Sequence, residues 1–166
     1  MVDTQEFAHF VASLPETERA LIDSPLSAET WFPRSQMTAV FRAMNQHLFA
    51  EDETTFYRLG YRQFHADLNM LYRMFIRAAR PTFIIAQAPK LWNAYSRHNG
   101  TLMLQHRAVR SCDVQVEGVC APCHAYWEYL RGPYAAGIIA TGEKNVSVKY
   151  ISGGGESSHC TMRVEW

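Results

Sequence analysis

The residues best suited to chemistry lie together in the segment Cys120-Ala-Pro-Cys123-His124. A C-x-x-C-H sequence can hold a c-type haem through two thioether bonds and an axial histidine. The C-x-x-C part alone suits a redox dithiol or half of a zinc site, because a helix that starts here would lower the pKa of its thiols. The spacing leaves haem c, zinc and a redox dithiol open. A fourth alternative is that the segment is simply the start of a buried helix and holds no cofactor.

A zinc site would need ligands from outside this segment. Zinc takes four ligands, at about 2.0–2.3 Å from thiolate or imidazole. With Cys123 and Cys160 as two of them, Cys120 and either His124 or His159 would complete a tetrahedron. The sequence leaves the cofactor unknown; zinc is the one to look for first, and haem c ranks behind it.

Four aromatic residues are candidates for lining a ligand pocket: Trp92, Tyr95, Trp127 and Tyr134. The pair Trp92 and Tyr95 on one helix is more simply explained as core or interface. The chain contains no H-E-x-x-H, no triad-like grouping and no carboxylate pair at a catalytic spacing. These observations favour a non-enzymatic role and leave an enzyme open.

Composition excludes some classes of protein. Hydrophobic residues make up 48% and charged residues 19% of the 166 residues, which is typical of a folded domain. Sixteen Lys and Arg balance sixteen Asp and Glu, so nothing indicates a nucleic-acid surface. Neither a secretory signal nor an apolar run long enough to span a membrane is present. We expect a cytoplasmic location, or a periplasmic one only if a signal peptide has been removed.

The predicted secondary structure that positions these residues changes from helices to mainly strands near Gly100. Helical periodicity fills the first hundred residues, and alternation with a period of two follows. The predicted strands lie near 101–108, 112–117, 146–152 and 159–165. A helix from near Pro122 joins the two strand pairs, and Gly132-Pro133 should kink or divide it. The expected fold class is therefore α+β, with N-terminal helices packed on a four-stranded antiparallel sheet.

Alternation also predicts which strand residues face inward. The residues expected on apolar faces are Cys112, Val114 and Val116 in one strand and Cys160, Met162, Val164 and Trp166 in another. Free cysteine is commonly a small buried hydrophobic residue, which is the simplest interpretation of Cys112. We expect one ligand-binding domain over 1–166, in which 1–30 form an N-terminal helical extension.

The order of these segments resembles a known superfamily. The matching pieces are Trp31-Phe-Pro, the run FYRLGYRQF, the run from Arg73 to Leu104, the helix opened by a cysteine, and the final hairpin ending in CTMRVEW. The chain is similar from about Trp31 to Trp166 to bacterial proteins of the haem-nitric-oxide-binding, 4-vinyl-reductase-type and TRAPP small-subunit superfamily. The resemblance implies an α+β fold, frequent dimerisation, and an apolar ligand or a protein partner.

The metal and haem sites of that superfamily transfer only in part. In zinc-binding members the ligands are a cysteine opening the helix, a Glu and a Cys on the penultimate strand, and a Cys on the last strand. Cys123 and Cys160 match the first and last, but the middle positions are Lys149 and Ser152, which are not zinc ligands. Members that bind haem use a Tyr-x-Ser-x-Arg element, whereas the nearest sequence here, Tyr95-Ser96-Arg97, has a different spacing.

The leading hypothesis is a non-enzymatic sensor or binding module for a small apolar or aromatic ligand, related to signalling. One alternative is a cofactor or redox protein that uses Cys120-Ala-Pro-Cys123-His124 with zinc, a dithiol or haem c. Another is a protein-interaction adaptor without a ligand. The resemblance and the apolar helical faces also predict a homodimer through the N-terminal helices.

Overall fold

The structure is a computed structural model that describes residues 4–23, 31–49, 52, 54–67 and 70–166. The helices before the sheet are α1 Thr4–Ser13, α2 Glu16–Asp23, α3 Arg34–His47, α4 Thr54–Asp67, α5 Met70–Ala78, α6 Pro81–Ile85 and α7 Ala88–Tyr95. The elements that follow are β1 Thr101–Gln105, β2 Ser111–Glu117, α8 His124–Ile139, β3 Ser147–Gly153 and β4 Cys160–Glu165.

The four strands form one sheet in the order β1-β2-β4-β3, and every neighbouring pair is antiparallel. The predicted fold class and the strand–strand–helix–strand–strand order are therefore confirmed. The first strand is shorter than expected, because it ends at Gln105 and the chain turns before Ser111.

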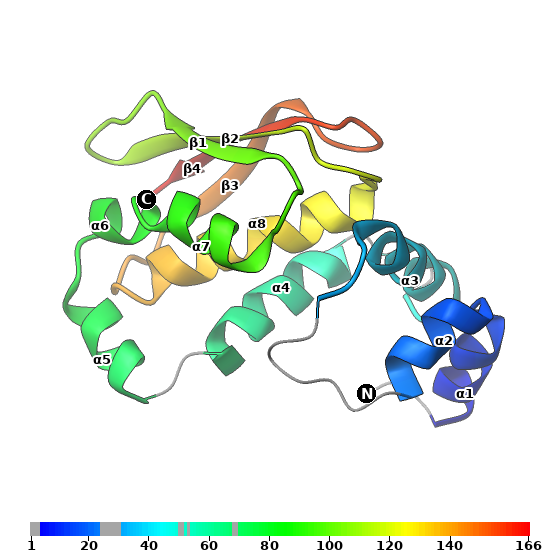
Figure 1. The fold of residues 1–166 in the computed structure, drawn as a ribbon. Coiled ribbons are helices and arrows are strands. Elements are labelled where there is room, and N and C mark those ends of the chain that lie inside the picture. Colours follow the sequence, from blue (N-terminus) through cyan, green and yellow to red (C-terminus); the bar gives the residue numbers. More distant parts are fainter. Residues whose placement is uncertain (1–3, 24–30, 50–51, 53, 68–69) are drawn as a thin grey trace.

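The elements are arranged in layers below the sheet (Figure 1). Helix α8 lies across one face of the sheet, and α4 runs along the side of α8 that faces away from the strands. Helices α1, α2 and α3 gather at one end of the molecule, and α5 lies at the other end. Within the described residues, no helix is both long enough and apolar enough to cross a membrane.

The core lies between the sheet and α8, and the alternation of the strands creates it. The inward residues of the two central strands are at most 1% exposed: Cys112, Val114, Val116, Cys160, Met162 and Val164. They belong to the same buried cluster as Trp127 and Ile138 of α8, which are fully buried. Burying a valine or methionine side chain of this kind contributes about 2 kcal/mol to stability.

Helices α4 and α8 approach each other closely enough for their backbones to touch. A Cβ atom added to Gly60 would lie 2.0 Å from the Tyr129 carbonyl oxygen. A Cβ added to Gly132 would lie 2.3 Å from the backbone nitrogen of Tyr61 and 2.4 Å from the Tyr57 carbonyl oxygen. Only glycine fits at both positions, so these two residues fix the crossing of the helices.

Helix α8 continues through Pro133 as one helix, so it is not divided at Gly132-Pro133. A kink there, the other predicted outcome, stays a prediction. Proline has no N–H to give to the carbonyl four residues earlier, which here is that of Tyr129. That carbonyl lies against the Cα of Gly60 instead. Gly60 of α4 therefore packs against the carbonyl that lacks its helical hydrogen bond, at the position where Pro133 would weaken an isolated helix.

Candidate functional site

The C-x-x-C-H segment forms the turn that begins α8. Cys123 is the residue before the helix, in an extended conformation, and His124 is the first helical residue. Cys123 is buried and Cys120 is exposed. Thr38 of α3 holds the turn, because its Oγ1 donates a hydrogen bond to the Ala121 carbonyl at 2.5 Å. The expectation that this segment is a helix start, with Cys120 outside and Cys123 inside, is confirmed.

Burial controls the chemistry of the inward thiols. It raises the pKa of Cys123, and it raises the pKa of Cys160 to about 12. The position at a helix start predicts a lowered pKa for Cys123, and this prediction is wrong because desolvation outweighs the nearby backbone N–H groups. Both side chains are thus neutral thiols near pH 7, which disfavours redox chemistry by these two residues, since that chemistry uses the thiolate.

The predicted zinc tetrahedron is not supported. Across the described residues, which include all five proposed ligands, no three His, Cys, Asp or Glu side chains gather as a metal site requires. His159 is exposed and contacts Ser157 at 2.8 Å between Nδ1 and Oγ, while the next residue, Cys160, is buried on the inner face of β4. Alternation along the strand separates these two residues.

The four aromatic residues proposed for a ligand pocket lie in different environments. Trp92 is buried, and its Nε1–H donates to the Gly100 carbonyl at 3.2 Å. Trp127 is fully buried in the core, Tyr134 is partly buried and packs against the core, and Tyr95 is 73% exposed on α7. None of the four lines either of the two hollows described below.

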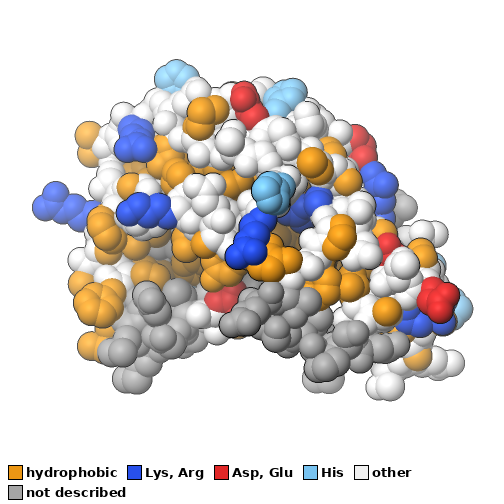
Figure 2. Space-filling view, in the orientation of Figure 1, with side chains coloured by type: hydrophobic (Ala, Val, Ile, Leu, Met, Phe, Trp, Pro, Cys, Tyr) orange, Lys and Arg blue, Asp and Glu red, His pale blue; other side chains and the backbone are white. Residues whose placement is uncertain are grey.

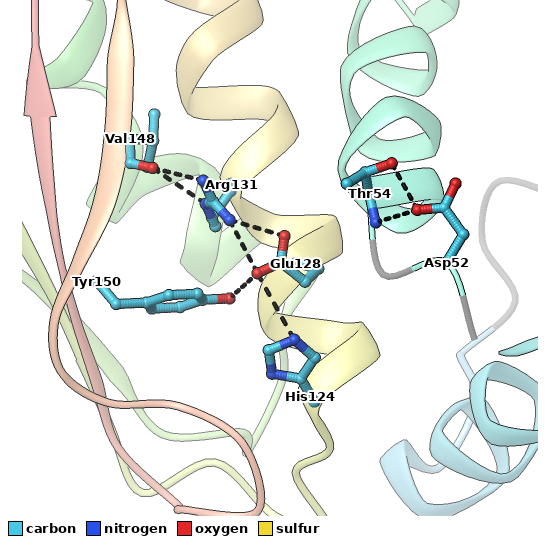
Figure 3. Close-up of polar contacts among 7 residues, drawn as sticks. All are labelled: Asp52, Thr54, His124, Glu128, Arg131, Val148 and Tyr150. Carbon is cyan, nitrogen blue, oxygen red and sulfur yellow. Dashed lines mark hydrogen bonds and ion pairs between the residues drawn. The ribbon is translucent and has the colours of Figure 1, made fainter.

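A charged network connects α8 to β3 (Figure 3). Glu128, which is buried, accepts hydrogen bonds from Nη1 of Arg131 at 2.8 and 2.9 Å and from the Tyr150 hydroxyl at 2.7 Å. Arg131 also donates from Nε and Nη2 to the Val148 carbonyl, at 3.1 and 2.8 Å. His124 lies 3.8 Å from Glu128, between Nε2 and Oε1. Every strong acceptor in this group is used within the protein.

The sequence does not predict this network. Its only local signal is a Glu and an Arg three residues apart on one helix, which more often marks an exposed pair. Burial raises the pKa of Tyr150, and the carboxylate of Glu128 raises it further. The arrangement positions α8 on the sheet and leaves no acid or base free to act on a substrate.

The second group in Figure 3, Asp52 with Thr54, caps the start of α4.

Two hollows are the clearest in the described part of the chain. The larger, of about 640 Å³, is open to solvent between α5 and α6 and is lined by Phe75, Ala78, Ala79, Arg80, Thr82 and Phe83. The smaller has a volume of about 90 Å³ and lies where α6 meets the end of the sheet, next to Cys112 and Trp166. Pockets for small molecules usually measure about 300–1,000 Å³. Only the larger hollow is of that size, and it is shallow, nearly as open as a flat surface.

Comparison with known proteins identifies the fold. An H-NOX protein from K. algicida, solved in the Fe(II) unliganded state, matches 98% of this chain and 86% of its own, with a TM-score of 0.70 and 9% identity. An oxygen-binding H-NOX domain related to soluble guanylate cyclases matches 96% of this chain and 92% of its own, with a TM-score of 0.63 and 8% identity. An H-NOX mutant from T. tengcongensis matches 99% and 97%, with a TM-score of 0.60 and 11% identity.

The chain therefore has the fold of haem-nitric-oxide-binding domains, as the resemblance predicted. No protein-family model and no curated protein matches it. The three structural matches give no support to the 4-vinyl-reductase part of the resemblance.

The described residues do not fit a haem. A haem in such a fold needs an axial ligand, commonly His, Cys, Met or Tyr, in a hollow that accepts the ring. All seven histidines are described, and none is buried. The larger hollow is lined by none of these four residue types, and the smaller is too small for a haem. Among the described residues, neither hollow thus combines a volume that accepts a haem with an axial ligand.

Proposed function

We propose that the chain is a non-enzymatic sensor or binding module that holds a small apolar or aromatic molecule without haem. The observation that carries this proposal is the shallow hollow between α5 and α6, where two phenyl groups and one guanidinium lie around an open space of about 640 Å³. The H-NOX fold supports it, since related structures include an oxygen-binding domain. A single domain over 1–166, a homodimer and a cytoplasmic location remain predictions.

The lining of the hollow indicates the kind of ligand. Phe75 and Phe83 present aromatic surface, and they are 74% and 60% exposed. Arg80 and Thr82 are the polar groups at its edge. A flat apolar ring could pack on the two phenyl groups while an acidic substituent pairs with the guanidinium of Arg80. An aromatic molecule with one anionic group is therefore the preferred ligand class.

A fluorescent probe of this class tests the proposal. We expect 8-anilinonaphthalene-1-sulfonate to bind the folded full chain at one site, with an increase in its emission. Phe83→Ala should weaken binding by about tenfold, since it removes one aromatic wall, and Arg80→Gln should weaken it by several fold. Leu91→Ala is the matched control, because Leu91 is 46% exposed on α7 and lies outside the hollow.

If the Phe83→Ala, Arg80→Gln and Leu91→Ala variants bound the probe equally well, the hollow between α5 and α6 would not be the ligand site. In that case the second candidate, a protein-interaction adaptor without a ligand, would be favoured. The adaptor function is supported by the large apolar side chains that are exposed on α5, α6 and α7.

A further inference from the structure

The segment that contains α5, α6 and α7 differs in charge from the rest of the chain. Between Asp67 and Asp113 the sequence contains no acidic residue. The same stretch holds seven of the sixteen Lys and Arg: Arg73, Arg77, Arg80, Lys90, Arg97, Arg107 and Arg110. In a protein without net charge, this segment of the chain is thus positively charged, and a negatively charged partner would be attracted to it.

Three of these cations are unpaired within the described structure. Arg77, Arg80 and Lys90 are exposed, and no ion pair joins them to any described acid. Arg110, by contrast, pairs with Glu143, with 3.0 Å between Nη2 and Oε2. The positive charge of α5, α6 and the start of α7 therefore remains available to an external group.

The same helices expose large apolar side chains. Ten large hydrophobic residues are exposed in the described chain, and half of them fall on these three helices: Met74, Phe75, Phe83, Leu91 and Tyr95. On α7, Leu91 and Tyr95 lie about one turn apart, and both are exposed. Hydrophobic and basic side chains gather over α5 and α6 in Figure 2, and no acidic side chain is visible there. We call the five apolar residues with Arg77, Arg80 and Lys90 the α5–α7 face.

We propose that the α5–α7 face binds the surface of a membrane that contains anionic lipids. Short helices with exposed aromatic and aliphatic side chains beside arginine and lysine are suited to a bilayer interface, where apolar groups enter the acyl boundary and cations meet phosphates. A partner helix would need a continuous apolar groove. Here the apolar residues are instead spread over three helices of five to nine residues.

Vesicle flotation of the full chain tests this inference. We expect binding to phosphatidylcholine vesicles that contain about 30 mol % phosphatidylserine, weak binding to pure phosphatidylcholine, and a loss of binding as salt is raised. The double variant Arg77→Glu/Lys90→Glu should bind the anionic vesicles at least about tenfold more weakly. Met74→Ser/Leu91→Ser should also bind more weakly, because it removes inserted apolar surface.

Two control variants match these changes elsewhere on the surface. Lys144→Glu reverses an exposed cation, and Ile151→Ser removes an exposed apolar side chain on the sheet. Both should bind vesicles as the unaltered chain does. Circular dichroism of all four variants is the check that each is folded.

None of the four altered residues of the test variants lines the hollow between α5 and α6. The two test variants should therefore keep the fluorescent-probe site, so that the membrane proposal and the ligand proposal fail independently. Equal binding to neutral and anionic vesicles, or no binding to either, would overturn the membrane proposal. A change in mass by light scattering in the same two variants would overturn it too, and would assign the α5–α7 face to a second copy of the chain.

Discussion

Alanine at Gly60 is expected to destabilise the protein by about 3 kcal/mol, the upper end of the range for overpacking in a well-packed core. The added methyl group would lie 2.0 Å from the Tyr129 carbonyl oxygen, which is backbone and cannot rotate away. Alanine at Gly132 meets the backbone of α4 in the same way and should cost about as much. Urea unfolding followed by circular dichroism measures the free energy of unfolding of each variant.

Gly137 supplies the matched control, because it lies in α8 as Gly132 does. A Cβ there would meet only the ends of side chains, Ile84 at 3.2 Å and Phe64 at 3.4 Å. Since alanine is a better helix former than glycine by about 1 kcal/mol, Gly137→Ala should change stability little or raise it. If all three variants lost the same stability, the close crossing of α4 and α8 would be disproved.

Removal of the Glu128 carboxylate is the second large expected effect. Glu128→Ala should cost about 3 kcal/mol, because it leaves the guanidinium of Arg131, whose side chain is 27% exposed, without its counter-ion. It also removes the acceptor of the Tyr150 hydroxyl. The loss would appear as a lower urea midpoint with an unchanged slope.

A double-mutant cycle separates this network from simple loss of packing. Glu128→Leu/Arg131→Met should cost clearly less than the sum of the two single changes, because neither charge is then left without a partner. The exposed pair Lys149–Glu165, at 3.7 Å, is the control, and Glu165→Ala should cost less than about 1 kcal/mol. Additive losses in the cycle would show that Glu128 and Arg131 do not act as a pair.

The sheet could be predicted because its pattern is local. Alternation of side chains places Cys112, Val114 and Val116 on one face whatever the rest of the chain does, and the register of β2 with β4 then buries them. The helix that starts after Pro122 could be predicted for the same reason, since proline and the change of period are both read from neighbouring residues. Cys123 inside and Cys120 outside follow from that helix start.

The other features depend on contacts between distant segments. Pro133 is a residue that commonly breaks a helix, yet α8 continues through it, with Gly60 of α4 packed against the Tyr129 carbonyl that the proline leaves unbonded. The pKa of Cys123 could not be inferred from its place at a helix start, because its burial depends on packing around the whole turn. The hollow between α5 and α6 likewise arises from how two helices meet, and no spacing along the chain predicts it.

The central claim, that this H-NOX fold serves a small apolar ligand without haem, is tested most directly by titrating the full chain with haemin. The absorption spectrum should remain that of free haemin at every ratio, and addition of carbon monoxide to the reduced sample should produce no protein-specific Soret band. A sharp Soret band that saturates at one haem per chain, and shifts when carbon monoxide is added, would contradict the account.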